Sequence, residues 1–356
     1  MSLSCLLQCT VVVLCYFLNH GSAQVVVTVD NTSGGFDVIV DNNLWFQSGP
    51  VSLMSDSLLY STYDNTLIFK TILESSGLDN IGEYLMSRIE WRTFPGNIPL
   101  VGYIRVYEDT IVFEQAFETN ITGSSVGDVN SIASSFPSFQ LFNAEQGAGV
   151  GYAHWVSWHY SEPTTNSSTE EEGFIQKGDC MDNNTPAVPV PGWKSPTMGK
   201  WNVETNLEGG LGGTGVTCIF NANSSLSAVL SPMNNFMVAS HVTPTPGLLQ
   251  VGILGTVTSI PEGFTLQTIL TFHRGGVNAA MSQWGELLRR VYDKPTVQEA
   301  RDKDLTLRYL GYTTDHGAFY YYNTATGLDY EDTLRAVHEY AQDRQIPYKY
   351  VLLDSW

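Results

Sequence analysis

Short apolar segments separated by turn residues follow one another from Val25 to His273. In several of them apolar side chains recur at every second position, which is the period of a β-strand with one buried face. Strands are therefore predicted at 25–29, 36–40, 67–72, 99–107, 110–117, 247–257 and 263–273. Many strands at this spacing, with no helical pattern between them, predict antiparallel sheets packed face to face. The expected fold is mainly a β-sandwich.

Two turns in this region predict β-hairpins. Glu108-Asp109 joins two alternating segments, and Pro261-Glu262-Gly263 precedes another segment that starts at Phe264. Residues 161–202 break the alternation with Ser, Thr, Glu, Asn and Pro, and this composition predicts a surface insertion between strands.

The apolar period changes after the last predicted strand. Apolar side chains then recur at helical spacing, with Asn278 as a candidate N-cap and Pro295 beyond the end. The predicted apolar face of this helix consists of Met281, Trp284, Leu287, Leu288 and Val291. We expect residues 276–304 to form a linker helix between two domains.

A different arrangement is expected at the C-terminal end. The apolar segment Leu305–Tyr312, an amphipathic helix starting near Asp329 and ending before Pro347, and the apolar segment Tyr348–Leu353 predict a parallel βαβ unit. A parallel pair must be covered on both faces, and two strands do not make a stable sheet. Residues 305–356 are therefore expected to be the incomplete start of a larger α/β domain, which follows a sandwich domain at 24–275.

The first 23 residues carry no Lys, Arg, Asp or Glu, and Val11–Leu18 is an unbroken apolar run followed by small residues. This pattern predicts a secretory signal peptide, residues 1–23, that is cleaved after Ala23. An uncleaved anchor is the weaker alternative, because a bilayer requires about 20 apolar residues. The mature protein is expected to be secreted and extracellular, or lumenal or lysosomal.

An oxidising compartment affects the interpretation of the cysteines. After cleavage only Cys180 and Cys218 remain, so a disulfide between them is expected, with two buried free thiols as the alternative. N-glycosylation sequons, which are consistent with secretion, begin at Asn31, Asn120, Asn166, Asn183 and Asn223.

The charge of the chain limits its partners. Asp and Glu number 36 against 17 Lys and Arg, a formal net charge of −19, and no window holds a basic cluster. Nucleic-acid binding needs such clusters, so no nucleic-acid partner is expected. An uncharged or a cationic partner fits better.

Candidate site residues lie where the two parallel strands end. Tyr312 and Asp315 follow the first of these strands, and Asp354 and Trp356 follow the second. Carboxylates accept hydrogen bonds from sugar hydroxyls, and aromatic rings stack on the apolar face of a pyranose, so these four residues are predicted to bind a carbohydrate. The alternative is that both aspartates are turn or capping residues.

Two segments resemble a known family. Leu310–Gly317 and Tyr348–Trp356 resemble the first two barrel strands of the alpha-galactosidase and raffinose-synthase clan of glycoside hydrolases. The resemblance implies a β-supersandwich in front of a (β/α)8 barrel, of which this chain holds the first βαβ unit. It also implies that Asp354 binds sugar hydroxyls and that Trp356 forms a pocket wall. The chain departs from the family in two places, since Tyr312–Thr314 stands where the family has a Trp-containing segment and Leu353-Asp354 where it has a pair of aspartates.

The resemblance implies a secreted, retaining, alpha-galactosidase-like hydrolase. In that clan the two catalytic carboxylates belong to later strands, so this chain is expected to be an inactive N-terminal fragment with no catalytic residue of its own. The alternative is a non-catalytic carbohydrate-binding or adhesion module. No metal and no cofactor is expected, because the sequence contains no zinc motif.

Two weaker signals remain. Gly210–Gly215 fits the pattern G-x-G-x-x-G but follows no buried strand, so a flexible loop is the better interpretation. His154, Trp155, Trp158 and His159 could form a sugar platform or a metal site, but sandwich core with histidines at its rim is the preferred interpretation.

Overall fold

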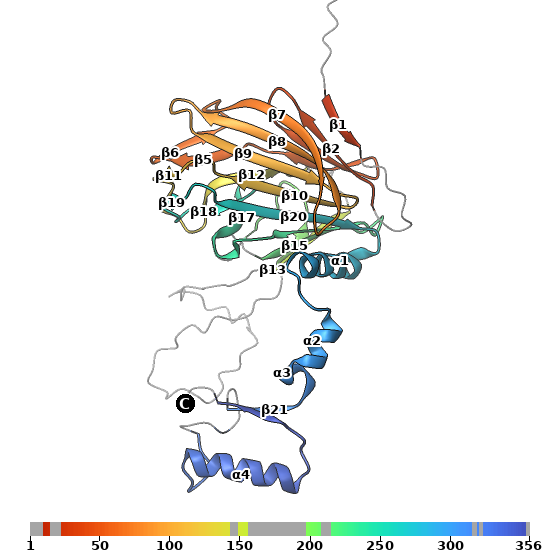
Figure 1. Cartoon of the computed structure of the whole chain (residues 1–356), viewed down its shortest axis with the longest axis vertical. Coiled ribbons are helices and arrows are strands. Elements are labelled where there is room, and N and C mark those ends of the chain that lie inside the picture. Colours follow the sequence, from red (N-terminus) through yellow and green to blue (C-terminus); the bar gives the residue numbers. More distant parts are fainter. Residues whose placement is uncertain are drawn as a thin grey trace, which may run out of the picture. The chain divides into compact units, whose positions relative to one another are not determined.

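The computed structural model describes residues 23–142, 149–155, 197–207, 215–314, 319 and 323–353, together with the backbone of 10–14. The chain divides into two compact units. Among the described residues, the boundary between them along the sequence lies between Val291 and Tyr292. Within the described residues, the first unit holds two large sheets, one small sheet, one α-helix and the short 3-10 helix η2 Phe236–Val238, and the second holds a short parallel sheet and three α-helices (Figure 1).

Two nine-stranded sheets form the first unit within the described residues. Sheet I comprises β1 Thr10–Leu14, β2 Val25–Asp30, β3 Phe36–Val40, β4 Asn43–Ser48, β5 Ser52–Ser55, β6 Leu58–Ser61, β12 Ile132–Gln140, β17 Ala239–Thr245 and β18 Leu248–Leu254. Sheet II has the order β14-β13-β15-β16-β20-β10-β9-β8-β7. Its strands are β7 Leu67–Leu78, β8 Glu83–Thr93, β9 Pro99–Val106, β10 Thr110–Ala116, β13 Val150–Trp155, β14 Thr197–Lys200, β15 Val216–Asn221, β16 Ser227–Pro232 and β20 Thr265–His273. A small separate sheet pairs β11 Ile121–Thr122 with β19 Ser259–Ile260.

Aromatic side chains fill the space between the two sheets. Phe113 of sheet II lies 5.3 Å from Phe36 and 5.8 Å from Phe139 of sheet I, measured between ring centroids. These rings are buried, as is Trp91 on β8. Tilted and edge-on contacts at such distances are the favoured geometries of aromatic pairs. The predicted β-sandwich is therefore confirmed.

The hairpin at Glu108-Asp109 is confirmed, because β9 and β10 pair in an antiparallel register with Ile111 opposite Val106. The second predicted hairpin is wrong. β19 pairs with β11, whereas β20 pairs with β10 and β16. Gly263 N–H donates to the carbonyl of Phe117 over 2.8 Å, so the turn is bonded to the end of β10 and directs the chain into sheet II.

The end of the predicted surface insertion belongs to the sandwich, which corrects the sequence interpretation. Thr197–Lys200 is strand β14, which pairs with β13, and Trp201 is only 2% exposed. The indole ring of Trp201 lies 5.8 Å from the ring of Tyr152, so burial of a large apolar side chain outweighs the polar composition of the segment. The remainder of the insertion, 161–196, lies outside the described residues.

The outer strand β1 falls within the predicted signal peptide. Its backbone pairs with β2 in an antiparallel register, with Val12 opposite Thr28. Cleavage after Ala23 stays a prediction, and it would leave β2 as the edge strand of sheet I.

Helix α1, Gly276–Val291, packs on the outer face of sheet II. Its apolar face is the predicted one, with Leu287 buried and Trp284 Nε1 donating to Ser231 Oγ over 2.8 Å. The helix begins earlier than predicted, at Gly276, whose N–H donates to the carbonyl of Ser225. Asn278 therefore lies inside the first turn and is not the cap. α1 is thereby part of the first unit, and the predicted domain boundaries stay a prediction.

Candidate functional site

The second unit contains the predicted parallel pair. Strands β21 Gly311–Thr313 and β22 Tyr350–Leu352 run parallel, with Tyr312 opposite Val351 and Thr313 opposite Leu352. Backbone hydrogen bonds extend this pairing at both ends, from Thr314 N–H to the carbonyl of Leu352 over 3.1 Å and from Lys349 N–H to the carbonyl of Leu310 over 2.9 Å. The register of the candidate site is therefore set by the backbone.

The strand predicted over Leu305–Tyr312 is largely wrong. Leu305–Arg308 forms the short helix α3, which follows α2 Val297–Lys303, and only the last part of the segment is strand. Asp304 caps α3, since its carboxylate accepts hydrogen bonds from the N–H groups of Thr306 and Leu307 over 2.8 and 3.2 Å. The cap satisfies the free N–H groups of the first turn and so favours a helix over an extended chain.

The crossover between the two strands is helix α4, Tyr330–Asp343. Its start is confirmed, because the carboxylate of Asp329 accepts a hydrogen bond from the N–H of Asp332 over 2.8 Å. The helix ends before Pro347, where Ile346 N–H donates to the carbonyl of Ala341 over 2.8 Å. Capping chemistry thus sets the length of the element that separates β21 from β22.

Tyr312 is the one predicted sugar-binding residue within the described part of the chain. It is half-buried on β21, its hydroxyl donates to the carbonyl of Phe319 over 3.3 Å, and its ring lies 6.1 Å from that of Tyr348. Burial raises the pKa of the Tyr312 hydroxyl, which therefore stays protonated and able to donate at neutral pH.

Asp315, Asp354 and Trp356 lie outside the described residues. Along the sequence, each aspartate comes two residues after a member of the last register pair, Thr313 and Leu352. Their assignment to a sugar site stays a prediction.

The end of β22 carries apolar side chains that the described residues leave uncovered. Val351, Leu352 and Leu353 are 52%, 58% and 44% exposed. Consecutive apolar residues are typical of a parallel strand that is covered on both faces. No group of three or more potential metal-ligating side chains occurs in the portion of the chain that the structure describes.

The histidine and tryptophan cluster divides between two environments. His154 on β13 is buried inside the sandwich with its Nδ1 2.8 Å from Thr217 Oγ1, whereas Trp155 packs with α1 residues on the outer face. Trp158 and His159 lie outside the described residues. The two described members therefore belong to the sandwich core, as the preferred interpretation predicts, but His154 is fully buried within the core and does not lie at its rim.

Sequence inspection missed a second buried histidine, His241 on β17. Its ring centroid lies 6.4 Å from that of His154, and both side chains are fully buried. Burial and then the neighbouring His154 lower the pKa of His241 to about 3. His241 lies in a stretch of β17, Ala239–Val242, whose four residues are all buried, so period-two alternation gives no signal for it.

Cys218 is a free cysteine among the described residues and is fully buried, and burial raises the pKa of its thiol to about 11. Cys180 lies outside the described residues, so the disulfide stays a prediction. The same holds for Asn166, Asn183 and the glycine-rich 210–214. Of the other sequons, Asn120 and Asn223 are exposed and Asn31 is half-buried, and their glycosylation stays a prediction.

No protein-family model and no curated protein sequence matches the chain. Solved glycoside hydrolases do match it in structure. Alpha-N-acetylgalactosaminidase NagBb from Bifidobacterium bifidum, solved as a GalNAc complex, has a TM-score of 0.51 and 10% identity over 96% of this chain and 52% of its own. A Glycoside Hydrolase Family 97 enzyme from Pseudoalteromonas sp. strain K8, in complex with panose, has a TM-score of 0.51 and 9% identity over 93% and 46%.

A third structure is GH36 alpha-galactosidase AgaA from Geobacillus stearothermophilus in complex with raffinose, with a TM-score of 0.47 and 10% identity over 96% of this chain and 50% of its own. The chain thus spans about half the length of these enzymes. It has the glycosidase-like fold of the first two, and the resemblance inferred from its C-terminal motifs agrees with this. None of the described helices is long and apolar enough to cross a membrane.

Proposed function

We propose that the chain is the N-terminal part of a secreted, retaining glycoside hydrolase of the alpha-galactosidase-like clan. The observation that carries the proposal is the order of the parts. An antiparallel sandwich is followed by a parallel strand pair with a crossover helix, and solved glycosidases with this fold are about twice as long. In this proposal β21 and β22 open a (β/α)8 barrel.

The uncovered side chains of β22 support the barrel. Val351 and Leu352 are exposed in a strand whose apolar sequence suits an environment buried on both faces. Further strands and helices would cover them and complete the sheet, because two parallel strands do not form a stable sheet.

The proposed sugar site lies at the carboxyl ends of β21 and β22, where parallel barrels place their active sites. Tyr312 supplies a ring and a hydroxyl there, Asp315 and Asp354 accept hydrogen bonds from sugar hydroxyls, and Trp356 forms one wall. The parallel register supports this. Thr313 lies opposite Leu352, and an aspartate follows each of them at the same separation along the sequence, so the two aspartates occupy equivalent positions after the two strands.

The proposal gives this chain a binding role and no turnover. Retention requires two carboxylates about 5 to 5.5 Å apart, and the clan that the chain resembles takes them from later barrel strands. Secretion follows from the predicted signal peptide, and the exposed Asn120 and Asn223 are compatible with glycosylation in the secretory pathway.

Two proteins test the proposal: residues 24–356, and a longer product of the same gene that includes the sequence beyond Trp356. Both are assayed with nitrophenyl α-galactoside and nitrophenyl α-N-acetylgalactosaminide. We expect turnover of one of them by the longer protein and none by residues 24–356. Turnover by the short protein would overturn its assignment as an inactive part, and a longer protein inactive on both substrates would overturn the proposed enzyme.

The second candidate function is a carbohydrate-binding module without catalysis. Exposed aromatic rings on the sandwich itself favour it, since they offer a sugar-binding surface that does not depend on a barrel.

A further inference from the structure

Two aromatic side chains stand out on the rim of the sandwich. Tyr63 is 85% exposed in the loop 62–66 between β6 and β7, and Phe94 is 65% exposed in the turn 94–98 between β8 and β9. Aromatic rings are usually at least partly buried, so rings this exposed on ordered turns point to a binding surface.

Backbone and side-chain hydrogen bonds hold the first loop in one conformation. The carboxylate of Asp64 accepts from the hydroxyl and the N–H of Thr66 over 2.6 and 3.1 Å, and Tyr63 N–H donates to Ser61 Oγ over 3.1 Å. Phe94 N–H then donates to the carbonyl of Thr66 over 2.7 Å, which joins the two loops directly. The backbones that carry the two rings therefore form one connected unit.

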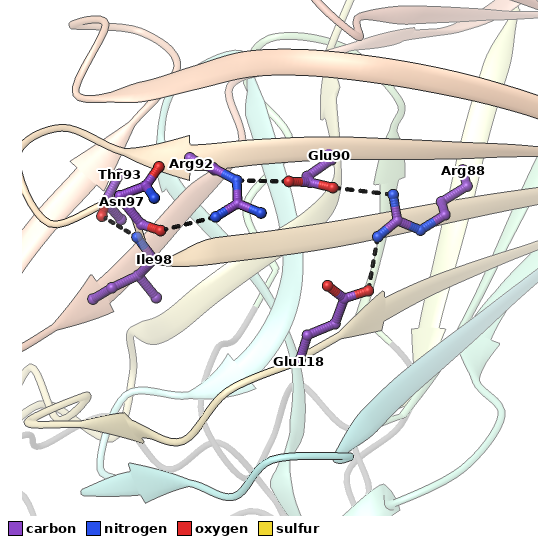
Figure 2. A network of polar contacts seen from close by, with 7 residues as sticks. All are labelled: Arg88, Glu90, Arg92, Thr93, Asn97, Ile98 and Glu118. Carbon is purple, nitrogen blue, oxygen red and sulfur yellow. Dashed lines mark hydrogen bonds and ion pairs between the residues drawn. The ribbon is translucent and has the colours of Figure 1, made fainter.

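A polar network fixes the second turn to sheet II. Ile98 N–H donates to Thr93 Oγ1 over 3.0 Å, and the guanidinium of Arg92 donates to the carbonyl of Asn97 over 3.3 Å. Figure 2 shows how the network continues through Glu90, which accepts from Arg92 over 2.7 Å.

The far end of this network is Arg88, which donates to Glu90 over 3.1 Å and to Glu118 over 2.7 Å. Arg88 and Glu90 are mostly buried, with side chains 20% and 13% exposed, so these contacts are better protected from solvent than those of a typical surface ion pair. The turn that presents Phe94 is thus attached to three charged side chains of β8.

Polar groups accompany the rings. Asp64, Asn65 and Asn97 are exposed in the same two turns. Hydrogen bonds from Thr66 lower the pKa of Asp64, so its carboxylate is an acceptor at neutral pH, while the asparagine amides both donate and accept. Rings for stacking beside acceptors and donors for hydroxyls match the chemistry of a sugar, and the net charge of −19 disfavours a polyanion.

We propose that Tyr63 and Phe94 form a carbohydrate-binding platform, here called the rim platform, that binds a neutral polysaccharide independently of the proposed β21–β22 site. Each ring stacks on the apolar face of a pyranose unit, and Asp64, Asn65 and Asn97 bind hydroxyl groups at its edges. The choice of a sugar as occupant rests on the proposed carbohydrate function, but the residues are separate from those of the proposed β21–β22 site.

Affinity electrophoresis in native gels that contain galactomannan tests the rim platform on the 24–356 protein. We expect the wild-type protein to be retarded and Tyr63→Ala/Phe94→Ala to bind roughly ten-fold more weakly or worse, as expected for losing two stacked rings. Tyr63→Phe keeps the ring and should keep most of the retardation. Leu59→Ala, which removes an aliphatic side chain 57% exposed on β6, is the matched control and should bind like wild type.

Three results would overturn the platform: no retardation of the wild-type protein, equal retardation of the double alanine variant, or a loss in Leu59→Ala as large as in the double variant. The last result would indicate a general apolar surface for a protein partner. Because both rings are exposed, the melting temperature of the double variant should match wild type, and this check identifies a folding defect. Failure of the proposed enzyme would appear separately, as absent turnover of the nitrophenyl glycosides by the longer protein.

Discussion

His154 on β13 and His241 on β17 lie with their ring centroids 6.4 Å apart, and their strands belong to opposite sheets of the sandwich. Both side chains are buried, and the pKa of His241 is lowered to about 3 by burial and by His154. The folded protein therefore binds a proton at this site less readily than the unfolded chain does. As the pH falls from about 6.5 toward 3, the free energy of unfolding should decrease.

Replacing His241 should remove this pH dependence. Between pH 6.5 and pH 5 the wild-type protein should lose about 1.6 kcal/mol of unfolding free energy more than His241→Leu, because the slope reaches 1.36 kcal/mol per pH unit only below the unfolded-state pKa of about 6.5. Denaturant unfolding at pH 7.5, 6.5 and 5 measures the difference. His338→Gln changes an exposed histidine on α4 and should keep the wild-type slope. Equal slopes for wild type and His241→Leu would contradict the prediction.

Asp354→Asn, made in the longer protein, separates a site residue from a turn residue. If Asp354 binds sugar hydroxyls, the change removes charge-assisted hydrogen bonds worth about 1.5 to 3 kcal/mol each, so kcat/KM should fall by roughly one to two orders of magnitude. The melting temperature should stay constant. Asp343→Asn alters an exposed carboxylate at the end of α4 and serves as the control. A lowered melting temperature with unchanged kcat/KM would instead identify Asp354 as a cap.

Two glycines should respond to alanine in opposite ways. A Cβ on Gly102 of β9 would lie 2.8 Å from the ring of Phe136 and 2.9 Å from that of Trp91, so Gly102→Ala should destabilise the sandwich by about 1 to 3 kcal/mol. A Cβ on Gly285 of α1 would meet nothing within 4 Å. Gly285→Ala should therefore stabilise the protein by about 0.5 to 1 kcal/mol through helix propensity. Denaturant unfolding of both variants checks the signs.

The disulfide prediction concerns Cys218 and Cys180. Because Cys218 is fully buried, a thiol reagent should not label it in the folded 24–356 protein. If the two cysteines form a disulfide, the protein unfolded without a reductant has no thiol that can react. If both are free thiols, it has two reactive thiols per chain. We expect no labelled thiol before reduction and two after it, counted by mass spectrometry of the secreted protein.

The features that local residue patterns predicted correctly are those that depend on neighbours in sequence. Period-two alternation located β9, β10 and β20, helical spacing located the apolar face of α1, and Asp329 marked the start of α4. The two apolar segments around α4 also predicted the parallel pairing, since a crossover helix brings β21 and β22 together in that direction.

Other features required contacts between distant parts of the chain. The partner of β20, the burial of Trp201 and the approach of His154 to His241 each join residues far apart in sequence. Strand propensity says where a strand forms but not which strand lies beside it, because pairing depends on the packing of both sheet faces at once. A connection such as 261–263 therefore resembles a hairpin in sequence and becomes a link between sheets only when the whole sandwich has assembled.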